Sequence, residues 1–495
     1  MGVLYKSTRS NSEPVTASQA VLAGLAPDGG LYVPTEIPKI EKSFEELSML
    51  DYKGVAYEVM KLFLEDYTEE ELRDCIERAY DEKFDTDEIA PLVEKNGAYY
   101  LELFHGATIA FKDMALSILP YLLTAAAKKN KITDRIVILT ATSGDTGKAA
   151  LAGFADVPGT EIIVFYPKGG VSKIQELQMV TQKGENTHVV AIHGNFDDAQ
   201  SGVKNIFNNS ELREKLSANG FRFSSANSIN IGRLVPQIVY YVYAYCRMIR
   251  NNAIKSGEAV NVCVPTGNFG NILAAYYAKL SGVPISKLIC ASNENKVLFD
   301  FFATGDYDRN REFILTTSPS MDILISSNLE RLIYRICGDD WNKNLELMRS
   351  LSENGKYSIS EEMKDRLSDF YGNYACEAEN FEGISKVYSS TGYVMDTHTG
   401  IASAVYEKYK AETGDATSTI IASTASPFKF SPAVINAIDP SFCAEDDFDY
   451  IERLKELSKM AEPDAIKQIR NAQIRHKAEA DPEKMPETVL GILGI

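Results

Sequence analysis

Apolar residues recur at two different spacings along the chain, and each spacing predicts a different kind of element. Over residues 44–64 and 69–83 they recur at helical spacing between charged residues, which predicts amphipathic helices. A Pro-Asp-Gly-Gly turn at 27–30 precedes a short strand-like run at 31–33. The first hundred residues are therefore predicted to be mostly helical.

From residue 135 onward, short runs that are apolar at every position alternate with helical segments. Such runs are typical of parallel strands that are buried on both faces, and their alternation with helices predicts a mainly parallel sheet covered by helices. The expected strands are 136–140, 161–166, 188–193, 221–225, 259–264, 288–291 and 417–422. The expected helices are 149–154, 172–182, 197–216, 233–251, 271–280 and 398–411.

These patterns divide the chain into three parts. We expect a mostly helical N-terminal domain over 1–95, an α/β region over 96–435 and a helical C-terminal tail over 436–495. Helices and loops dominate residues 300–380, and the charged tail is expected to be a surface appendage. There is no internal repeat and no Ser/Gly-rich linker, so the parts are expected to pack together.

Composition and charge narrow the possible partners. The chain has 495 residues, of which 45% are hydrophobic, and this composition is typical of a globular protein of several domains. Its formal net charge of −18 disfavours binding to nucleic acid or to an anionic membrane. An anionic substrate would therefore need a local cluster of cations and backbone N–H groups.

The cysteines and histidines give no sign of a disulfide framework or a metal site. The seven cysteines are scattered and never spaced as C-x-x-C, and the five histidines form no zinc-binding motif. No apolar run is long enough to span a membrane, and the N-terminus has no signal-peptide core. We therefore expect a cytoplasmic protein with reduced thiols and no metal.

Two glycine-containing loops follow expected strands and lead into expected helices. Residues 140–147 and 265–271 combine small or amide side chains with two glycines each. In parallel sheets, ligands bind where such loops meet the positive ends of helices. Each loop could bind a carboxylate or phosphate. The first could equally be a tight capped turn, whereas Phe269 would be unusual in the second unless it had a ligand or a packing role. Neither has the spacing of a P-loop or of a dinucleotide-binding motif.

Two further polar clusters lie at strand ends. Residues 423–427 gather hydroxyl groups that could bind a ring nitrogen, although a helix cap explains them more simply. Residues 225–233 contain Asn, Ser and Arg side chains that could bind an oxyanion, with Ser172 and Lys173 as possible contributors. A plain surface role for Arg233 has similar weight.

Lys112 is unusual because it interrupts an apolar stretch, between Ala-Thr-Ile-Ala-Phe and, after Asp113, Met-Ala-Leu. A lysine in an apolar setting has a lowered pKa and becomes an amine nucleophile that can form a Schiff base. The alternative is a lysine that extends to solvent near a helix start, with Asp113 as its partner. The local sequence alone favours that alternative.

Taken together, these segments resemble the threonine synthase family of pyridoxal-phosphate enzymes, which has fold type II, the tryptophan-synthase-β-like fold. The resemblance covers nearly the whole chain and is closest to the longer microbial and fungal form. The segments that match are 7–9, 24–31, 104–106, 110–113, 141–147, 227–233, 267–271 and 423–425. It implies two interleaved α/β lobes with mainly parallel sheets and the cofactor between them, the smaller lobe over approximately 141–235.

The resemblance also implies a role for each candidate residue. Lys112 would hold pyridoxal 5'-phosphate as a Schiff base and move protons, and Thr424 would hydrogen-bond the ring nitrogen. The cofactor phosphate would be bound by Gly267, Asn268, Phe269, Gly270 and Asn271. The substrate carboxylate would be bound by Thr142, Ser143, Asp145 and Thr146. The substrate phosphate would be bound by Asn227, Ser228 and Arg233, with Ser172 and Lys173 as weaker candidates.

The implied reaction converts O-phospho-L-homoserine and water into L-threonine and phosphate, the last step of threonine biosynthesis. The alternative is another lyase on the same scaffold, such as a threonine/serine dehydratase, which has no need for a second phosphate site. A binding protein that has lost catalysis is less consistent with an intact Lys112. The substrate would be a small anionic amino acid, and the protein a monomer or homodimer.

Three residues depart from the family pattern. Ala107 stands where relatives often have Pro, and Ser426 and Phe428 replace the His and Ala of a Thr-Ala-His-Pro-Ala-Lys-Phe segment. None of the three changes the lysine or the glycine-containing loop at 265–271.

Overall fold

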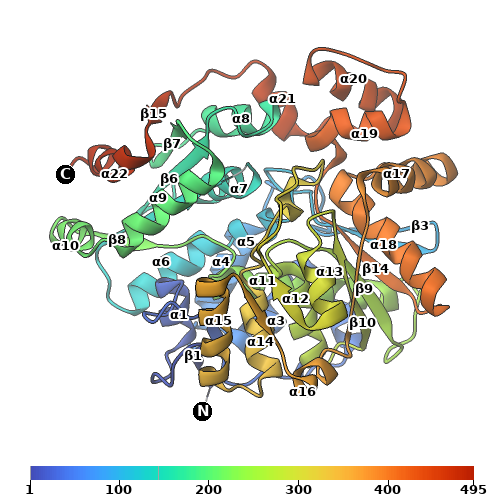
Figure 1. The fold of residues 1–495 in the computed structure, drawn as a ribbon, viewed down its shortest axis with the longest axis horizontal. Helices are drawn as coiled ribbons and strands as arrows, with labels where there is room; N and C mark the ends of the chain where they lie inside the picture. The colour runs from blue at the N-terminus through green and yellow to red at the C-terminus, as the bar shows by residue number, and fades with distance from the viewer. Residues whose placement is uncertain (1, 143) are drawn as a thin grey trace.

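Two separate sheets form the framework of the computed structural model, which describes residues 2–142 and 144–495 (Figure 1). The larger sheet has the strand order β13-β10-β9-β14-β4-β3 and is parallel except for β3, which pairs with β4 in antiparallel orientation. The mainly parallel α/β fold is therefore confirmed. Its strands are β3 (Leu92–Lys95), β4 (Ala98–Glu102), β9 (Val260–Pro265), β10 (Ile285–Ser292), β13 (Phe370–Tyr374) and β14 (Thr419–Ser423).

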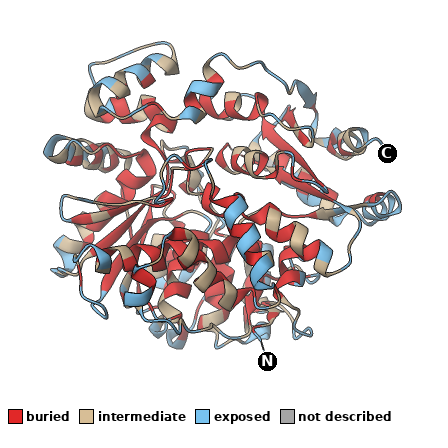
Figure 2. Cartoon of the chain, turned by 180° about the vertical axis from the view of Figure 1, so that it is seen from behind, coloured by how far each residue is buried: buried red, intermediate tan, exposed pale blue. Residues whose placement is uncertain are grey.

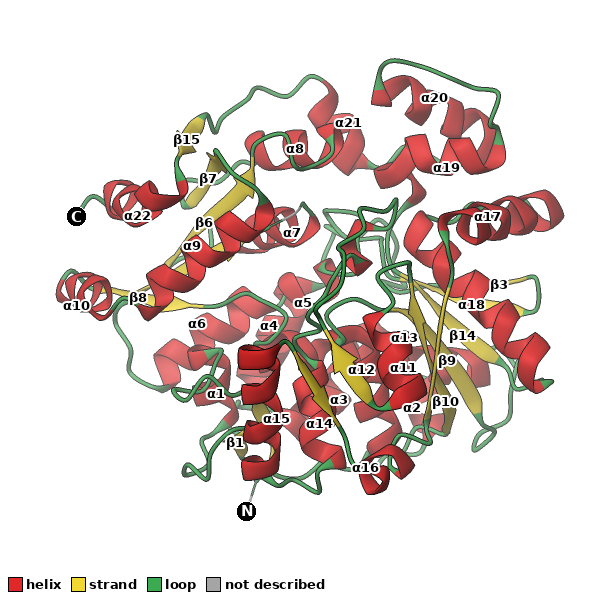
Figure 3. Ribbon diagram, viewed as in Figure 1, coloured by secondary structure: helices red, strands yellow, loops and turns green. Residues whose placement is uncertain are grey.

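The smaller sheet has the order β15-β7-β6-β5-β8, and all of its pairs are parallel. Figure 3 shows it apart from the larger sheet, on the side where the C-terminus lies. The strands are β5 (Arg135–Ala141), β6 (Thr160–Pro167), β7 (Thr187–Ile192), β8 (Phe221–Ser224) and β15 (Ala478–Ala480). The expectation that the tail is a surface appendage is wrong, because β15 extends this sheet and hydrogen-bonds along β7.

Helix α11 (Ile231–Arg250) forms the centre of the larger lobe. Apolar and aromatic side chains occur on every face of this helix, which is typical of a helix that is buried all round. Helices α2, α3 and α12 pack along it. Figure 2 shows buried positions, in red, gathered on the inner strands and helices of the molecule. The larger lobe also contains α1 (Ala17–Ala23), α2 (Phe44–Ser48), α3 (Tyr52–Phe63), α4 (Glu69–Ala79), α5 (Asp113–Leu116), α6 (Leu119–Lys129), α12 (Gly270–Leu280), α13 (Val297–Thr304), α14 (Leu329–Ile336), α15 (Trp341–Asn354), α16 (Glu361–Asp365), α17 (Glu377–Thr391) and α18 (Thr397–Thr413).

The tail helices join both lobes through a shared apolar cluster. Ile109 of the larger lobe, Ile174 of the smaller lobe and Ile451 of the tail are all buried in it. The burial of these side chains accounts for the ordered tail, since each removes apolar surface from water. The remaining helices are α7 (Asp145–Phe154), α8 (Lys173–Val180), α9 (Phe196–Asn208), α10 (Ser210–Ala218), α19 (Ser431–Ile438), α20 (Asp447–Ser458), α21 (Asp464–Arg470) and α22 (Met485–Leu493).

The two lobes meet at the helix that begins next to Lys112. A Cβ atom at Gly153 of α7 would lie only 2.1 Å from the carbonyl oxygen of Leu116 in α5. Only glycine permits this close approach of the two helices. Residue 112 therefore lies at the junction between the lobes.

The structure differs from the sequence expectations in the shorter strands. Strands β3 and β4 place part of the first hundred residues in the larger sheet, and β1 (Tyr5–Ser7) and β2 (Tyr32–Pro34) form a separate two-stranded sheet. Residues 300–380 contain β11 (Asp306–Asp308), β12 (Lys356–Ser358) and β13 in addition to helices. Within the described ranges, no helix has both the length and the apolar character that crossing a membrane requires.

Candidate active site

The segment that carries Lys112 is held in place by its own neighbours. The carboxylate of Asp113 accepts hydrogen bonds from the backbone N–H of Thr108 at 2.8 Å and from its hydroxyl at 2.5 Å. Ile109 adopts φ 53°, a left-handed conformation that is costly for a β-branched residue. Strain of this kind persists only where the surroundings enforce it and is common at functional sites.

The Lys112 segment lies beside the segment that carries Thr424. Ala110 and Ala425 form an antiparallel bridge, and the N–H of Phe111 donates to the carbonyl of Thr424 at 2.8 Å. Thr424 is buried. The structure thus brings together two of the predicted site residues that lie far apart in the sequence.

The amino group of Lys112 lies among one hydroxyl, one carboxylate and two cations. Its Nζ atom is 3.1 Å from the Ser320 hydroxyl and 3.4 Å from the Asp145 carboxylate. Burial lowers the pKa of Lys112; Asp145 opposes this effect, while Lys429 and Arg233 add to it. The group is therefore prepared to release its proton and act as a nucleophile.

The loop between β9 and α12 presents a row of free donors. The backbone N–H groups of Gly267, Asn268, Phe269, Gly270 and Asn271 have no acceptor among the described residues. They are five consecutive donors at the positive end of α12, an arrangement that binds phosphate. The residues therefore fit the phosphate group of the cofactor that the sequence predicted.

Packing fixes the shape of this loop. Phe269 adopts the left-handed conformation (φ 63°), and its buried ring stacks on Phe302. A Cβ atom at Gly267 would lie 2.3 Å from the carbonyl oxygen of Ser320, so a side chain there would push the loop away from its neighbour. Asn271 accepts hydrogen bonds from the hydroxyls of Tyr240 and Tyr241, while its buried Nδ2 atom has no partner in the described part of the chain.

The loop between β5 and α7 satisfies two of its N–H groups internally. The Thr142 hydroxyl accepts from the N–H groups of Gly144 at 3.0 Å and Gly147 at 2.9 Å. The Asp145 side chain faces Lys112 and Lys429, and this pairing holds its pKa well below the usual range. A carboxylate here repels another carboxylate, so the side chain of Asp145 does not fit the predicted substrate-carboxylate role. Thr146 is partly exposed, and Ser143 lies outside the described residues.

The cluster at 227–233 contains one buried cation. Arg233 is 3% exposed, donates from one terminal nitrogen to the carbonyl of Ala226 at 3.0 Å, and has a buried Nε without a partner among the described residues. Burial lowers the pKa of Arg233 to about 10. Asn227 and Ser228 are partly exposed beside it. A buried guanidinium without a carboxylate partner fits an anionic ligand.

Helix α8 contacts the site through Gln175 and not through Ser172 or Lys173 at its N-terminus. Ser172 caps the helix by accepting from the N–H of Gln175, and exposed Lys173 pairs with Asp446 of the tail at 3.1 Å. The amide of Gln175 donates to Asp145 at 3.0 Å. The structure therefore does not bring Ser172 and Lys173 together with Lys112.

Besides Gln175, three polar residues of the site were not predicted from the sequence. Ser320 contacts Lys112, and its backbone N–H donates to Nε2 of buried His398 at 3.1 Å. Lys429 is fully buried and lies 2.9 Å from Asp145. Lysine between two phenylalanines at 428–430 was a visible signal for Lys429, whereas nothing in the sequence marks Ser320.

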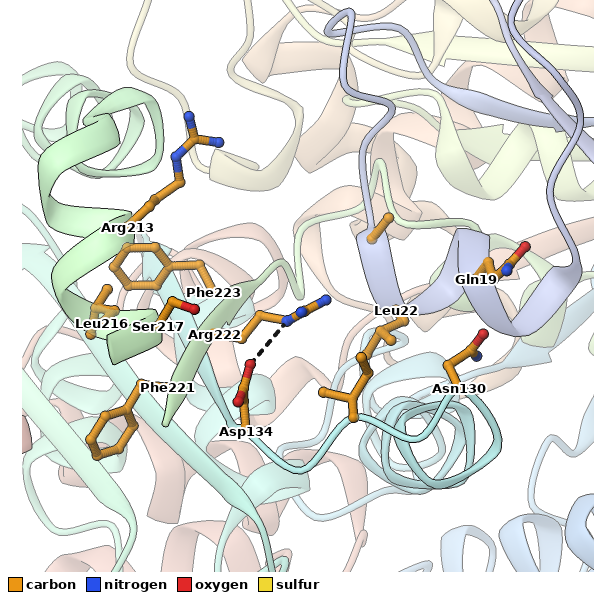
Figure 4. Close-up of a pocket in the computed structure, with 12 residues that line it drawn as sticks. Gln19, Leu22, Asn130, Asp134, Arg213, Leu216, Ser217, Phe221, Arg222 and Phe223 are labelled. Carbon is orange, nitrogen blue, oxygen red and sulfur yellow. Dashed lines mark ion pairs between the residues drawn. The ribbon is translucent and has the colours of Figure 1, made fainter. Parts of the chain in front are cut away.

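A pocket of about 560 Å³ lies away from this site (Figure 4). It opens between α1 and β8 and is lined by Leu22, Asn130, Arg213 and Phe223, among others. Arg222 and Asp134 form an ion pair of 3.4 Å within it. None of the predicted site residues lines it.

Comparison with known proteins agrees with the arrangement of these residues. The sequence matches "Threonine synthase N terminus" over residues 4–80, "Pyridoxal-phosphate dependent enzyme" over 87–425 and "Threonine synthase, C-terminal" over 399–478. It is 36% identical to the threonine synthase of Saccharomyces cerevisiae over 98% of this chain and 99% of that protein. The chain belongs to the threonine synthase family. The predicted resemblance is thus confirmed, and with it membership of a pyridoxal-phosphate-dependent enzyme family.

Solved structures of the threonine synthase family share the whole fold. The crystal structure of threonine synthase from yeast has a TM-score of 0.88 at 33% identity and covers 99% of both chains. A PLP-bound threonine synthase from Brucella melitensis has a TM-score of 0.85 at 34% identity, again over 99% of both chains. Human threonine synthase-like 1 is 40% identical over 85% of this chain, which spans 58% of the length of that relative.

Proposed function

We propose that this chain is a threonine synthase that converts O-phospho-L-homoserine and water into L-threonine and phosphate. Pyridoxal 5'-phosphate would be held by Lys112, by the five free N–H groups of residues 267–271 and by the hydroxyl of Thr424. The observation that supports this most directly is the set of unsatisfied donors around one buried amine. Full-length similarity to threonine synthases of yeast and Brucella supports the choice of reaction.

Each group of the chain has a defined task in this reaction. When bound, the cofactor supplies an electron sink for negative charge at the substrate Cα. Lys112 Nζ takes the proton from Cα and later returns it, a role for which burial prepares the amine by lowering its pKa. The Ser320 hydroxyl, 3.1 Å away, accepts a hydrogen bond from this amine and helps to fix its position. Phosphate leaves from Cγ, and water adds at Cβ.

Binding of the substrate uses cations and backbone donors. We assign the substrate phosphate to Arg233 with Asn227 and Ser228, because Arg233 is buried and lacks a carboxylate partner among the described residues. We assign the substrate carboxylate to Thr142, Thr146 and the first N–H groups of α7. Ser172 and Lys173 stay weaker candidates, since each already has a partner.

The experiment is an assay of the purified protein with pyridoxal phosphate and O-phospho-L-homoserine. We expect phosphate and threonine in equal amounts, and no turnover from Lys112→Ala. Release of a keto acid from threonine, without phosphate release from phosphohomoserine, would instead favour a dehydratase. Borohydride reduction followed by peptide mapping should find the cofactor on Lys112.

We further propose three properties of the whole protein. The described thiols are all unpaired, and four of the seven are buried, which is consistent with a cytoplasmic location. A monomer or homodimer remains the proposed assembly. We keep the proposed division of the chain into 1–95, 96–435 and 436–495, with the tail strand β15 as an edge strand of the smaller lobe.

A further inference from the structure

Lys429 is a second buried lysine beside the proposed catalytic amine. Its ammonium group is completely shielded from solvent, lies 2.9 Å from one oxygen of Asp145 and donates to the carbonyl of Thr108 at 3.0 Å. Lys112 contacts the other oxygen of Asp145 at the longer distance of 3.4 Å. One carboxylate therefore serves two lysines, and the nearer of them is Lys429.

The charges around Lys112 show why it matters that Asp145 is shared between two lysines. Asp145 is the anion that favours a proton on Lys112, while Lys429 and Arg233 are the cations that disfavour it. His398 reaches Lys112 only through the backbone of Ser320. Because buried charges are weakly screened, a carboxylate already neutralised by one ammonium attracts a second proton less strongly.

Lys429 is itself set among other charged groups. Asp113 and Lys148 both interact with it electrostatically, and its segment is fixed by the buried ring of Phe428 and by the capping hydroxyl of Ser426. The ammonium group is thus held in one position rather than left to move between partners.

We infer that Lys429 is a positioning residue for Lys112: by pairing with Asp145, it limits how strongly that carboxylate holds a proton on the Lys112 nitrogen. Lys429 does not touch the reacting atoms in this arrangement. This role rests on the proposed function, since it assumes that Lys112 bears the cofactor.

The test is a pH titration of the visible absorbance of the holoenzyme, which reports protonation of the nitrogen atom that joins Lys112 to the cofactor. In Lys429→Met, the Asp145 carboxylate no longer pairs with a second ammonium group. The proton affinity of the Lys112 nitrogen should therefore rise about tenfold, equivalent to one pKa unit. Asp145→Asn should lower it by a similar factor. Lys168→Met is the matched control, because exposed Lys168 also pairs with a carboxylate, Glu479, but lies outside the site.

The double variant Lys429→Met/Asp145→Asn removes both buried charges and keeps the test available if either single variant fails to fold. The proton affinity of the Lys112 nitrogen in the double variant should differ from that in Asp145→Asn by much less than tenfold, because the carboxylate through which Lys429 acts is gone. An unchanged titration in Lys429→Met, or a tenfold rise in the double variant over Asp145→Asn, would overturn the inference. Cofactor absent from Lys112 after borohydride reduction would instead overturn the proposed function.

Discussion

The two glycine-containing loops of the site have similar compositions and opposite electrical characters. The loop at 265–271 has five N–H groups with no acceptor in the part of the chain that the structure describes, and it contains no ionisable side chain. In the loop at 141–147, two N–H groups donate to the Thr142 hydroxyl, and the carboxylate of Asp145 lies beside two lysines. Small residues and glycines at a helix start therefore indicate that an anion can bind, while the side chains decide whether the donors are free.

The largest expected effect comes from the residue that lies between the two loops. Lys112→Ala should lower turnover by about 10³-fold or more, because no other described amine contacts both Ser320 and Asp145. Folding should change little, since Asp145 keeps Lys429 as its partner. Phosphate release and chemical denaturation measure the two quantities. Turnover within tenfold of the wild type would contradict the assignment.

A methyl group at Gly267 should disrupt the loop with free donors. Gly267→Ala places a Cβ atom 2.3 Å from the Ser320 carbonyl oxygen, so the row of N–H groups must shift. We expect cofactor affinity to fall at least tenfold, measured by titrating the apoprotein with pyridoxal phosphate. Gly491→Ala is the control, because a Cβ atom there meets no atom within 4 Å. Equal affinities in the two variants would show that the loop does not bind the cofactor phosphate.

Removal of the Thr142 hydroxyl should affect only the loop at 141–147. Thr142→Val leaves the N–H groups of Gly144 and Gly147 buried without an acceptor, at a cost of about 1–3 kcal/mol in unfolding free energy. KM for phosphohomoserine should rise while cofactor affinity stays constant. Thr142→Ser, which keeps the hydroxyl, should behave like the wild type. A loss of cofactor affinity in Thr142→Val would show that the two loops do not act separately.

Ser320 contacts both loops, and its substitution should have a smaller effect. Its carbonyl lies against Gly267, and its hydroxyl lies 3.4 Å from Asp145 and 3.1 Å from Lys112. Ser320→Ala removes only the hydroxyl, so turnover should fall about tenfold, the value of one hydrogen bond. Steady-state kinetics with a matched cofactor titration would separate the two contacts. An effect as large as that of Lys112→Ala would make Ser320 a principal catalytic group.

The smallest effect should be the loss, at acidic pH, of the stability that Asp145 contributes. The folded-state pKa of Asp145 lies below its unfolded value of about 3.9, so its stabilising contribution is complete above that pH and is lost as pH falls toward the folded-state pKa. The difference in unfolding free energy between wild type and Asp145→Asn should therefore shrink below about pH 4. Denaturation curves between neutral and acidic pH measure it. A difference that grows in acid would contradict the pairing of Asp145.

The sequence predicted the elements whose pattern is local. The strands at 136–140 and 259–264 were found because buried parallel strands are apolar at every position, and they correspond to β5 and β9. Strand β13 was missed because Gly372 and Asn373 interrupt its apolar run. Strand β15, with the sequence Ala-Glu-Ala, has no pattern of its own and exists through its pairing with β7.

The residues of the site show the same difference between features with a local sequence pattern and features that folding creates. Lys112 stood out because its neighbours along the chain are apolar, and the loop at 265–271 because of its glycines. Lys429 and Ser320 take their roles from contacts with Asp145 and Lys112 that only the folded chain creates. The sequence also could not distinguish a loop with five free donors from one in which a threonine hydroxyl accepts two of the N–H groups.

The strand β15 has a consequence for how the molecule is made. Its partner β7 is synthesised early, whereas β15 follows every strand of the larger sheet in the chain. During translation, one edge of the smaller sheet therefore stays uncovered until the larger lobe has emerged from the ribosome. A nascent chain halted before residue 478 would leave the unpaired backbone groups of β7 accessible to other chains.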